Sequence, residues 1–241
     1  MYFSHKIEIH ICDSLFTHQK PTMTKIMIFD TETSGLIPKD SKQLADYPHI
    51  LQVSFIIYND ETEEIEKTYN TYVNAGIPVP EKITDLTGIT QNMCDGGKPI
   101  INVLYDFYYA YLDCHVVAAH NLKFDIRMME ISMQRHIDDI KQRCLAMLLM
   151  FDTRISKKEQ FCTMLHCIDE CNIVCEAKDK KGFTYTYKKF PKLEEAHRHY
   201  FKSVPGGLHN SLVDSFVCLR IYLKQRYGRD ITNNEFENWM E

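Results

Sequence analysis

The feature that most restricts how this chain can fold is a short apolar run at residues 26–29, which ends at Asp30 and is soon followed by Gly35. Four apolar residues are too few for a buried helix, so we predict a central strand. Two longer strand-like segments follow at 50–59 and 64–74, and four polar residues separate them. This spacing predicts that the two segments form an antiparallel hairpin.

The spacing of the apolar residues changes further along the chain, where helices are expected to alternate with strands. The expected elements are a helix at 81–86 closed by Gly88, a helix at 100–112, a short strand at 115–119 and a helix at 124–136. This order predicts an α/β fold with a mixed sheet. Residues 154–195 are irregular and polar, and a hairpin is expected to pair 173–176 with 183–187. A capping box from Thr232 to Glu235 predicts a last helix.

Two carboxylates stand at the end of the first predicted strand, at Asp30 and Glu32. Residues i and i+2 of a strand project to the same face, so both side chains can reach one cation. Like charges held this close repel each other unless a metal neutralises them. Taken alone, however, such a pair is more simply a polar strand end.

Two further segments carry residues of the same chemical kind. Residues 119–125 read A-H-N-L-K-F-D and open a predicted helix, whose N-terminus tolerates the charge of Asp125. Residues 207–215 read G-L-H-N-S-L-V-D-S, so that His209 precedes Asp214 by five residues. Glycines at 206 and 207 give the loop before that helix conformational freedom. An imidazole in such a loop can serve as a general base at neutral pH.

Taken in order, these blocks resemble the three motifs of the DEDDh (DnaQ-like) 3′–5′ exonuclease family. This family includes the epsilon proofreading subunits of bacterial DNA polymerase III, oligoribonuclease and ribonuclease T. The first block, F-D-T-E-T-S-G-L at 29–36, is similar to the family's first motif, and the others match H-N-x-x-F-D and H-x-x-x-x-D. A sister group has Tyr four residues before the last aspartate, where this chain has Asn210. The resemblance covers about residues 25–225, including softer matches at 83–90 and 190–195.

The resemblance implies an RNase H-like fold, with a central mixed five-stranded sheet flanked by helices. It also implies two Mg²⁺ ions, which Mn²⁺ can replace. The implied metal ligands are Asp30, Glu32, Asp125 and Asp214, and His209 is the implied general base, so these five are the expected catalytic residues. The expected substrate-binding residues are Thr33, Gly35, Leu36, Asn121 and Phe124. Stacking and backbone contacts do not read sequence, so we expect a non-specific enzyme for single-stranded or frayed 3′ ends.

The expected domain organisation is simple. Residues 1–22 form an N-terminal extension, with Met23 as the expected natural start of the chain. Residues 23–228 form the exonuclease domain, which includes an insert at about 154–195, and residues 229–241 form a helical tail. The sequence does not indicate an oligomeric state.

The charge and the cysteines bear on partners and compartment. The net charge of −5 would oppose a polyanionic ligand, but four of the acids are expected metal ligands, which leaves about −1. Nine cysteines in no regular framework, without a secretory leader, predict a reducing cytoplasmic or nuclear environment. No apolar stretch approaches the length of a bilayer span, so no membrane partner is expected.

Three other groups of residues have simpler interpretations. The cysteines at 162, 167, 171 and 175 lack zinc-type spacing, and a helix could carry the last three on one buried face. The aromatic residues at 107, 108, 109 and 111 are expected to pack a helix. The lysines at 178, 180, 181, 188 and 189 form a basic cluster that is either a solvated face or a contact for the nucleic-acid backbone.

Several functional alternatives stay open. We favour DNA as the substrate, because the blocks resemble the proofreading subunits overall, and a DNA polymerase as a candidate partner. An exoribonuclease of the oligoribonuclease or ribonuclease T type would need only a pocket that accommodates the 2′-hydroxyl. A polymerase-associated protein that uses the fold for interaction is a second alternative. An RNase H-like endonuclease or integrase is a third, although it gives no reason for the spacing of His209 and Asp214.

Overall fold

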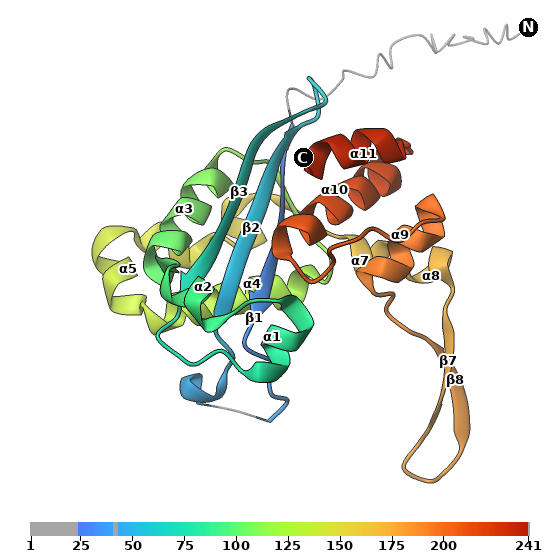
Figure 1. The fold of residues 1–241 in the computed structure, drawn as a ribbon, viewed down its shortest axis with the longest axis horizontal. Coiled ribbons are helices and arrows are strands. Elements are labelled where there is room, and N and C mark those ends of the chain that lie inside the picture. The colour runs from blue at the N-terminus through green and yellow to red at the C-terminus, as the bar shows by residue number, and fades with distance from the viewer. Residues whose placement is uncertain (1–23, 41–42, 241) are drawn as a thin grey trace, which may run out of the picture.

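A mixed sheet forms the centre of the fold, in a computed structural model that describes residues 24–40 and 43–240 (Figure 1). Its strand order is β4-β3-β2-β1-β5-β6. The strands are β1 Lys25–Thr33, β2 Ile50–Asn59, β3 Glu64–Asn74, β4 Lys98–Pro99, β5 Val116–Ala119 and β6 Glu159–Cys162. β1, β2 and β3 are antiparallel neighbours, whereas β5 is parallel to β1, β6 to β5 and β4 to β3. The mixed sheet is confirmed, with six strands in place of the expected five.

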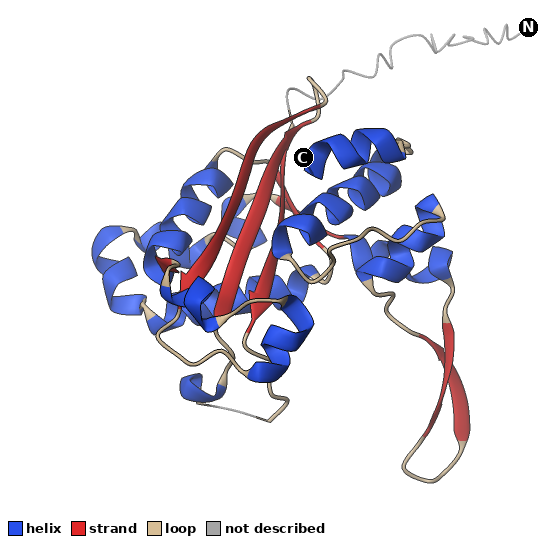
Figure 2. Cartoon of the chain, viewed as in Figure 1, coloured by secondary structure: helices blue, strands red, loops and turns tan. Residues whose placement is uncertain are grey.

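Helices cover both faces of this sheet (Figure 2). The main helices are α1 Glu81–Thr87, α2 Gln91–Asp95, α3 Ile100–Leu112, α4 Leu122–Arg135, α5 Ile137–Arg143, α9 Leu193–Phe201, α10 Ser211–Tyr227 and α11 Asn233–Met240. Single turns are α6 Thr153–Ser156, α7 Thr163–His166 and α8 Ile168–Cys171, and the 3₁₀ helices are η1 Leu44–Asp46 and η2 Leu145–Leu149.

Alternation along β1 divides the core into two layers. Met27 and Phe29 pack with α3 and α4, whereas Ile26 and Ile28 pack with α10 and α11 on the other face. All ten residues of β2 are buried. A strand covered on both faces has no polar side, which is why β1 and β2 are such continuous apolar runs. The same alternation directs Asp30 and Glu32 to the face on which α10 packs.

The sequence predicted most of these elements. The bounds of β2, β3 and α3 agree with the predicted segments, and α1 ends at Gly88, which has a left-handed conformation with φ of 75°. The capping box of the last helix is present, since the Glu235 N–H donates to Thr232 Oγ1 and the Glu235 carboxylate accepts from the Thr232 N–H. The predicted hairpin is present as β7 Val174–Lys178 and β8 Thr184–Lys188. Residues 1–22, predicted as an extension, lie outside the described residues.

Some local predictions were wrong. The segment at 154–195 is less irregular than expected, because it contains β6, which pairs with β5 at the edge of the central sheet. Cys175 does not share a helix with Cys167 and Cys171, because α8 ends at Asn172 with a left-handed φ of 46° and Cys175 lies in β7. No group of cysteines in the described part of the chain is arranged to hold a metal. The packing predicted for the aromatic residues of α3 is confirmed for Phe107, Tyr108 and Tyr111, and it was wrong for Tyr109 alone among the four, which is exposed.

Candidate active site

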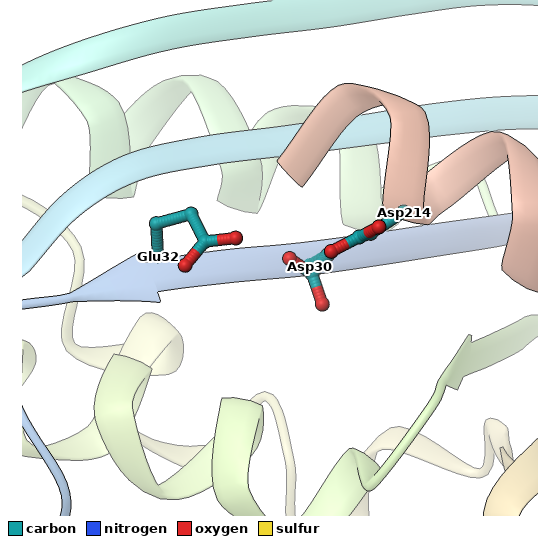
Figure 3. Close-up of side chains that lie close together, drawn as sticks. All are labelled: Asp30, Glu32 and Asp214. Carbon is teal, nitrogen blue, oxygen red and sulfur yellow. The ribbon is translucent and has the colours of Figure 1, made fainter. Parts of the chain in front are cut away.

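Three carboxylates converge where the C-terminal part of β1 meets the start of α10. Asp30 and Glu32 come from β1 and Asp214 from the first turn of α10, and ligand oxygens of all three lie within 4.8 Å of one another (Figure 3). In the described part of the chain, no other group of three or more acidic, histidine or cysteine side chains is arranged in this way. The cluster therefore has the composition and spacing of a site for a hard divalent cation.

The start of α10 is fixed on the sheet by polar side chains of β2. The hydroxyls of Ser54 and Ser211 are hydrogen bonded at 2.6 Å, and the Ser211 N–H donates to Gln52 Oε1 at 3.3 Å. Asn210 caps the helix by accepting from the N–H of Leu212 at 3.1 Å. These contacts set the position of Asp214 relative to β1. Sequence reasoning missed Gln52 and Ser54, although two polar residues in an otherwise apolar strand were a visible signal.

Asp125 approaches β1 along the edge that pairs with β5, opposite the edge that pairs with β2. The pairing of β5 with β1 stops at Ile28, so the flank of β1 beyond that residue is open. The Asp125 carboxylate fills this opening, where Oδ1 accepts from the Thr31 N–H at 3.1 Å and from the Thr31 hydroxyl at 2.7 Å. Its other oxygen, Oδ2, is buried and has no hydrogen-bond partner in the described structure. One oxygen of Asp125 is thus held in place and the other is left free.

Burial makes this arrangement of carboxylates unfavourable in its charged form. Burial raises the pKa of Asp30 well above its usual value, and Asp125, Asp214 and Glu32 raise it further. Burial also raises the pKa of Glu32 to about 7. Burial, with the charge of Glu32, raises the pKa of Asp214 to about 7.

The pKa of Asp125 is raised to about 8, mainly by burial, although its hydrogen bonds to Thr31 lower it. Among the described residues, no Lys or Arg forms an ion pair with any of the four carboxylates. Asp214 Oδ1 is also buried without a hydrogen-bond partner. Unpaired buried acids are costly, and cations can supply the missing compensation. The donor set therefore fits divalent metal ions.

His209 lies in the exposed loop before α10. Its backbone N–H donates to Asp214 Oδ2 at 3.2 Å, and its φ of 68° is in the left-handed region. Gly207, two residues earlier, is also left-handed, with φ of 75°. No hydrogen bond joins the imidazole to any described residue. The structure thus ties the backbone of His209 to the carboxylate cluster and leaves its ring at the surface.

The five predicted substrate-binding residues surround the ends of β1 and β5 in different ways. Thr33 is buried and its hydroxyl donates to the carbonyl of Gly35 at 2.8 Å, whereas Leu36 is 84% exposed. Asn121 is the left-handed N-cap of α4, with φ of 67°. Phe124 is half-buried against the core layer of α3 and α4. Leu36 and Asn121 are therefore exposed, whereas Thr33 is buried and Phe124 is half-buried.

Comparison with known proteins places the chain in a family. The model of the RNase T family, described as exonuclease, matches residues 27–222. The chain belongs to this exonuclease family. This match confirms the DEDDh family that the three motifs implied.

Two curated relatives and two solved structures illustrate the similarity of the exonuclease. It is 31% identical over 109 residues to DNA polymerase III PolC-type from Clostridium perfringens, and 33% identical over 110 residues to that from Streptococcus sanguinis. These matches cover 45% and 46% of this chain but only 7% of each relative.

The fold is similar to that of E. coli Exonuclease I in complex with dA16, with a TM-score of 0.56 and 13% identity, over 90% of this chain and 43% of the other. For the complex of the same enzyme with dT13, the TM-score is 0.57 and the sequence identity is 14%, over 86% of this chain and 42% of the other. In the part of the exonuclease that the structure describes, no helix combines the length and the apolar character needed to cross a membrane.

Proposed function

We propose that this exonuclease removes nucleoside monophosphates one at a time from the 3′ end of DNA, in proofreading or repair, with the help of two divalent cations. One observation carries the proposal. Three carboxyl groups converge beside β1, and a fourth, that of Asp125, is hydrogen bonded to Thr31 of the same strand; two of the four, Asp125 and Asp214, keep a buried oxygen without a partner in the described structure. A protein that used these acids only for structure would have satisfied those oxygens.

Asp30, Glu32, Asp125 and Asp214 are the residues that would hold the cations. Their oxygen donors suit Mg²⁺ best, and Mn²⁺ has similar preferences. The bound cations would neutralise the carboxylates and draw negative charge from the scissile phosphate. The role of this chain is to hold the acids close together in a buried site where no described Lys or Arg pairs with them.

His209 is the proposed general base. A base must reach the attacking water, and His209 is exposed while its backbone N–H is hydrogen bonded to Asp214 of the cluster, which suits such an approach. The hydrogen bond of its backbone to Asp214 keeps the residue near the acids while the side chain stays free to turn. Gly206 and Gly207 precede it and make such movement of the loop easy.

Leu36, Asn121, Thr33, Gly35 and Phe124 are the proposed lining of the terminal-nucleotide site. The exposed side chain of Leu36 suits an apolar contact with the last bases, which does not depend on their identity. DNA is favoured as the substrate because the PolC-type relatives are DNA polymerases and Exonuclease I was solved with DNA oligonucleotides. Association with a polymerase is a proposal on the same ground.

A time course on 3′-labelled and 5′-labelled single-stranded DNA and RNA in Mg²⁺ tests this function. We expect labelled mononucleotide to appear at once from the 3′ label, and a ladder shortening by single nucleotides from the 5′ label. Internal cuts would favour an endonuclease, and preference for RNA would favour the exoribonuclease alternative. Absence of any cleavage would contradict the proposal and favour an interaction protein.

The role of His209 has its own test. The variant His209→Ala should lower kcat by roughly 10²–10⁴ while the oligonucleotide still binds, because the base acts on the chemical step. Val204→Gly, at an exposed position earlier in the same loop, would show how much of the loss comes from a loosened loop. A variant that lost binding but kept kcat would contradict the assignment of His209 as the base.

A further inference from the structure

An arm built from β7 and β8 stands apart from the central sheet. The two strands pair only with one another, and Figure 1 shows the arm projecting from the body beyond α8. Tyr185 and Tyr187 lie on one face of the arm, opposite Ala177 and Cys175 on the partner strand. Because these opposite residues are small, the arm itself does not cover the tyrosine rings.

The aromatic residues of the arm form an open surface. Tyr185 is 51% exposed and Tyr187 45%, and their ring centroids lie 6.1 Å apart. Phe183, which precedes them toward the tip, is 70% exposed. Exposed rings in a row, spaced along an extended strand, are the surface on which successive bases of a single strand stack.

The charges of the arm suit a polyanion. Between residues 174 and 188 there are four lysines and only two acids, although the whole chain has a net charge of −5. The side chains of Lys178, Lys180 and Lys181 are exposed, and none of them forms an ion pair with a described residue. Lys188 pairs at 2.7 Å with Asp169, which is itself exposed. The arm is therefore a local basic region on an acidic protein.

The root of the arm is joined to the candidate active site. The arm is closed by a hydrogen bond from the Lys189 N–H to the Ile173 carbonyl. Two residues further on, the carbonyl of Pro191 is hydrogen bonded to His120 Nε2 at 3.0 Å. His120 directly precedes Asn121, the N-cap of the helix α4 that carries Asp125. A groove of 970 Å³ has Phe190 on its wall together with Asn121 and Lys123. The groove thus leads from the N-terminus of α4 to the root of the arm.

We propose that the arm binds the single-stranded DNA upstream of the 3′-terminal nucleotide, with bases stacked on Tyr185 and Tyr187 and phosphates near the lysines of the tip. This inference rests on the proposed function, since it assigns a path to the same substrate. It requires that DNA long enough to reach from the carboxylates to the arm is bound more tightly than a very short strand. The contacts are independent of base sequence.

The test compares two double variants on a 20-nucleotide oligothymidylate and on a trimer. Tyr185→Ala with Tyr187→Ala removes the aromatic face, and Thr184→Ala with Thr186→Ala is the matched control on the opposite face. Each ring lost should raise KM for the 20-mer about 5-fold or more, hence about 25-fold or more for both, with kcat unchanged. Hydrolysis of the trimer should not change, which also shows that the variant is folded. The threonine control should behave as wild type.

Binding of the labelled 20-mer in EDTA, measured by fluorescence anisotropy, separates this inference from the proposed function. Weaker binding by the tyrosine variant supports the arm even if the wild type does not hydrolyse DNA. Replacing Lys178, Lys180 and Lys181 with Ala should reduce the slope of log K against log salt by about 2. Unchanged KM and unchanged anisotropy in the tyrosine variant, as expected if the arm docks a protein instead, would overturn the inference.

Discussion

Neutralising one acid of the cluster should make the metal-free protein more stable. Asp214 is 9% exposed, its Oδ1 has no partner, and its pKa is raised from 3.8 to about 7. In the variant Asp214→Asn the amide keeps an acceptor for the His209 N–H and gains a donor toward the neighbouring carboxylates. The substitution thus removes a repulsive charge and keeps the shape of the side chain.

The magnitude follows from the shift in pKa. The pKa of Asp214 rises by about 3, and each pKa unit corresponds to roughly 1.4 kcal/mol, so the charged Asp214 lowers the free energy of unfolding by about 4 kcal/mol at pH 8. Water that reaches the cluster reduces this repulsion, so we expect Asp214→Asn to raise the free energy of unfolding by at least about 2 kcal/mol. For a chain of this size, that gain raises Tm by about 4–8 °C. A group whose pKa is raised on folding stabilises fully below its unfolded pKa, and this stability is lost as the pH rises through its folded pKa. The advantage of the variant should therefore be small near pH 4 and largest at pH 8.

Urea and thermal unfolding in EDTA, at pH 5 and pH 8, measure this effect. Asp85→Asn, an exposed aspartate on α1, is the control and should change stability by less than about 0.5 kcal/mol. Saturating Mg²⁺ should stabilise the wild type by about 3 kcal/mol at one hundred times Kd, but the variant much less. A variant that is less stable than the wild type in EDTA at pH 8 would refute the electrostatic reasoning.

Two further predictions concern stability away from the carboxylates. Arg220 is 3% exposed and donates hydrogen bonds to the Ile231 carbonyl and to Asn233, so it joins the proposed tail to the proposed domain at 23–228. The variant Arg220→Ala should therefore lower the free energy of unfolding in urea by about 3 kcal/mol. Arg226→Ala, an exposed residue of the same helix, should cost under about 1 kcal/mol, and equal losses would contradict this account of Arg220. Burial lowers the pKa of His120 to about 4, so folding favours the neutral ring and this stability is lost as the pH falls below about 6.5. Between pH 7.5 and 5 the wild type should lose about 2 kcal/mol more than His120→Gln, and parallel pH profiles of the two proteins would show that folding does not lower the pKa of His120.

The elements that the sequence predicted well are those whose pattern is strong and local. β2 and β3 were predicted with their bounds because the long, mostly apolar run of β2 and the four polar residues after it are visible without knowledge of the partner strand. β6 was missed because four residues, only two of them buried, have no pattern of their own. Its identity as a strand comes from pairing with β5, which lies about forty residues earlier.

In the candidate site, too, the residues with a local pattern were predicted and the contacts between distant residues were not. The carboxylates at 30, 32, 125 and 214 could be named because their spacing in each block is short and resembles known motifs. The contact between Ser54 and Ser211 joins residues 157 positions apart, so no local pattern reports it. The conformation of His209 was equally hidden, since a left-handed φ at a residue other than glycine depends on the surrounding loop.

The activity proposed for this chain requires that four acids from distant segments hold the cations that the reaction needs. Calorimetric titration of Mn²⁺ into the metal-free protein at pH 8 measures this binding, with Asp30→Asn as the variant and Asp85→Asn as the control. We predict binding of two ions to the wild type and the control, and loss of at least one in Asp30→Asn together with loss of 3′-mononucleotide release. Full binding and full hydrolysis by Asp30→Asn would contradict the account.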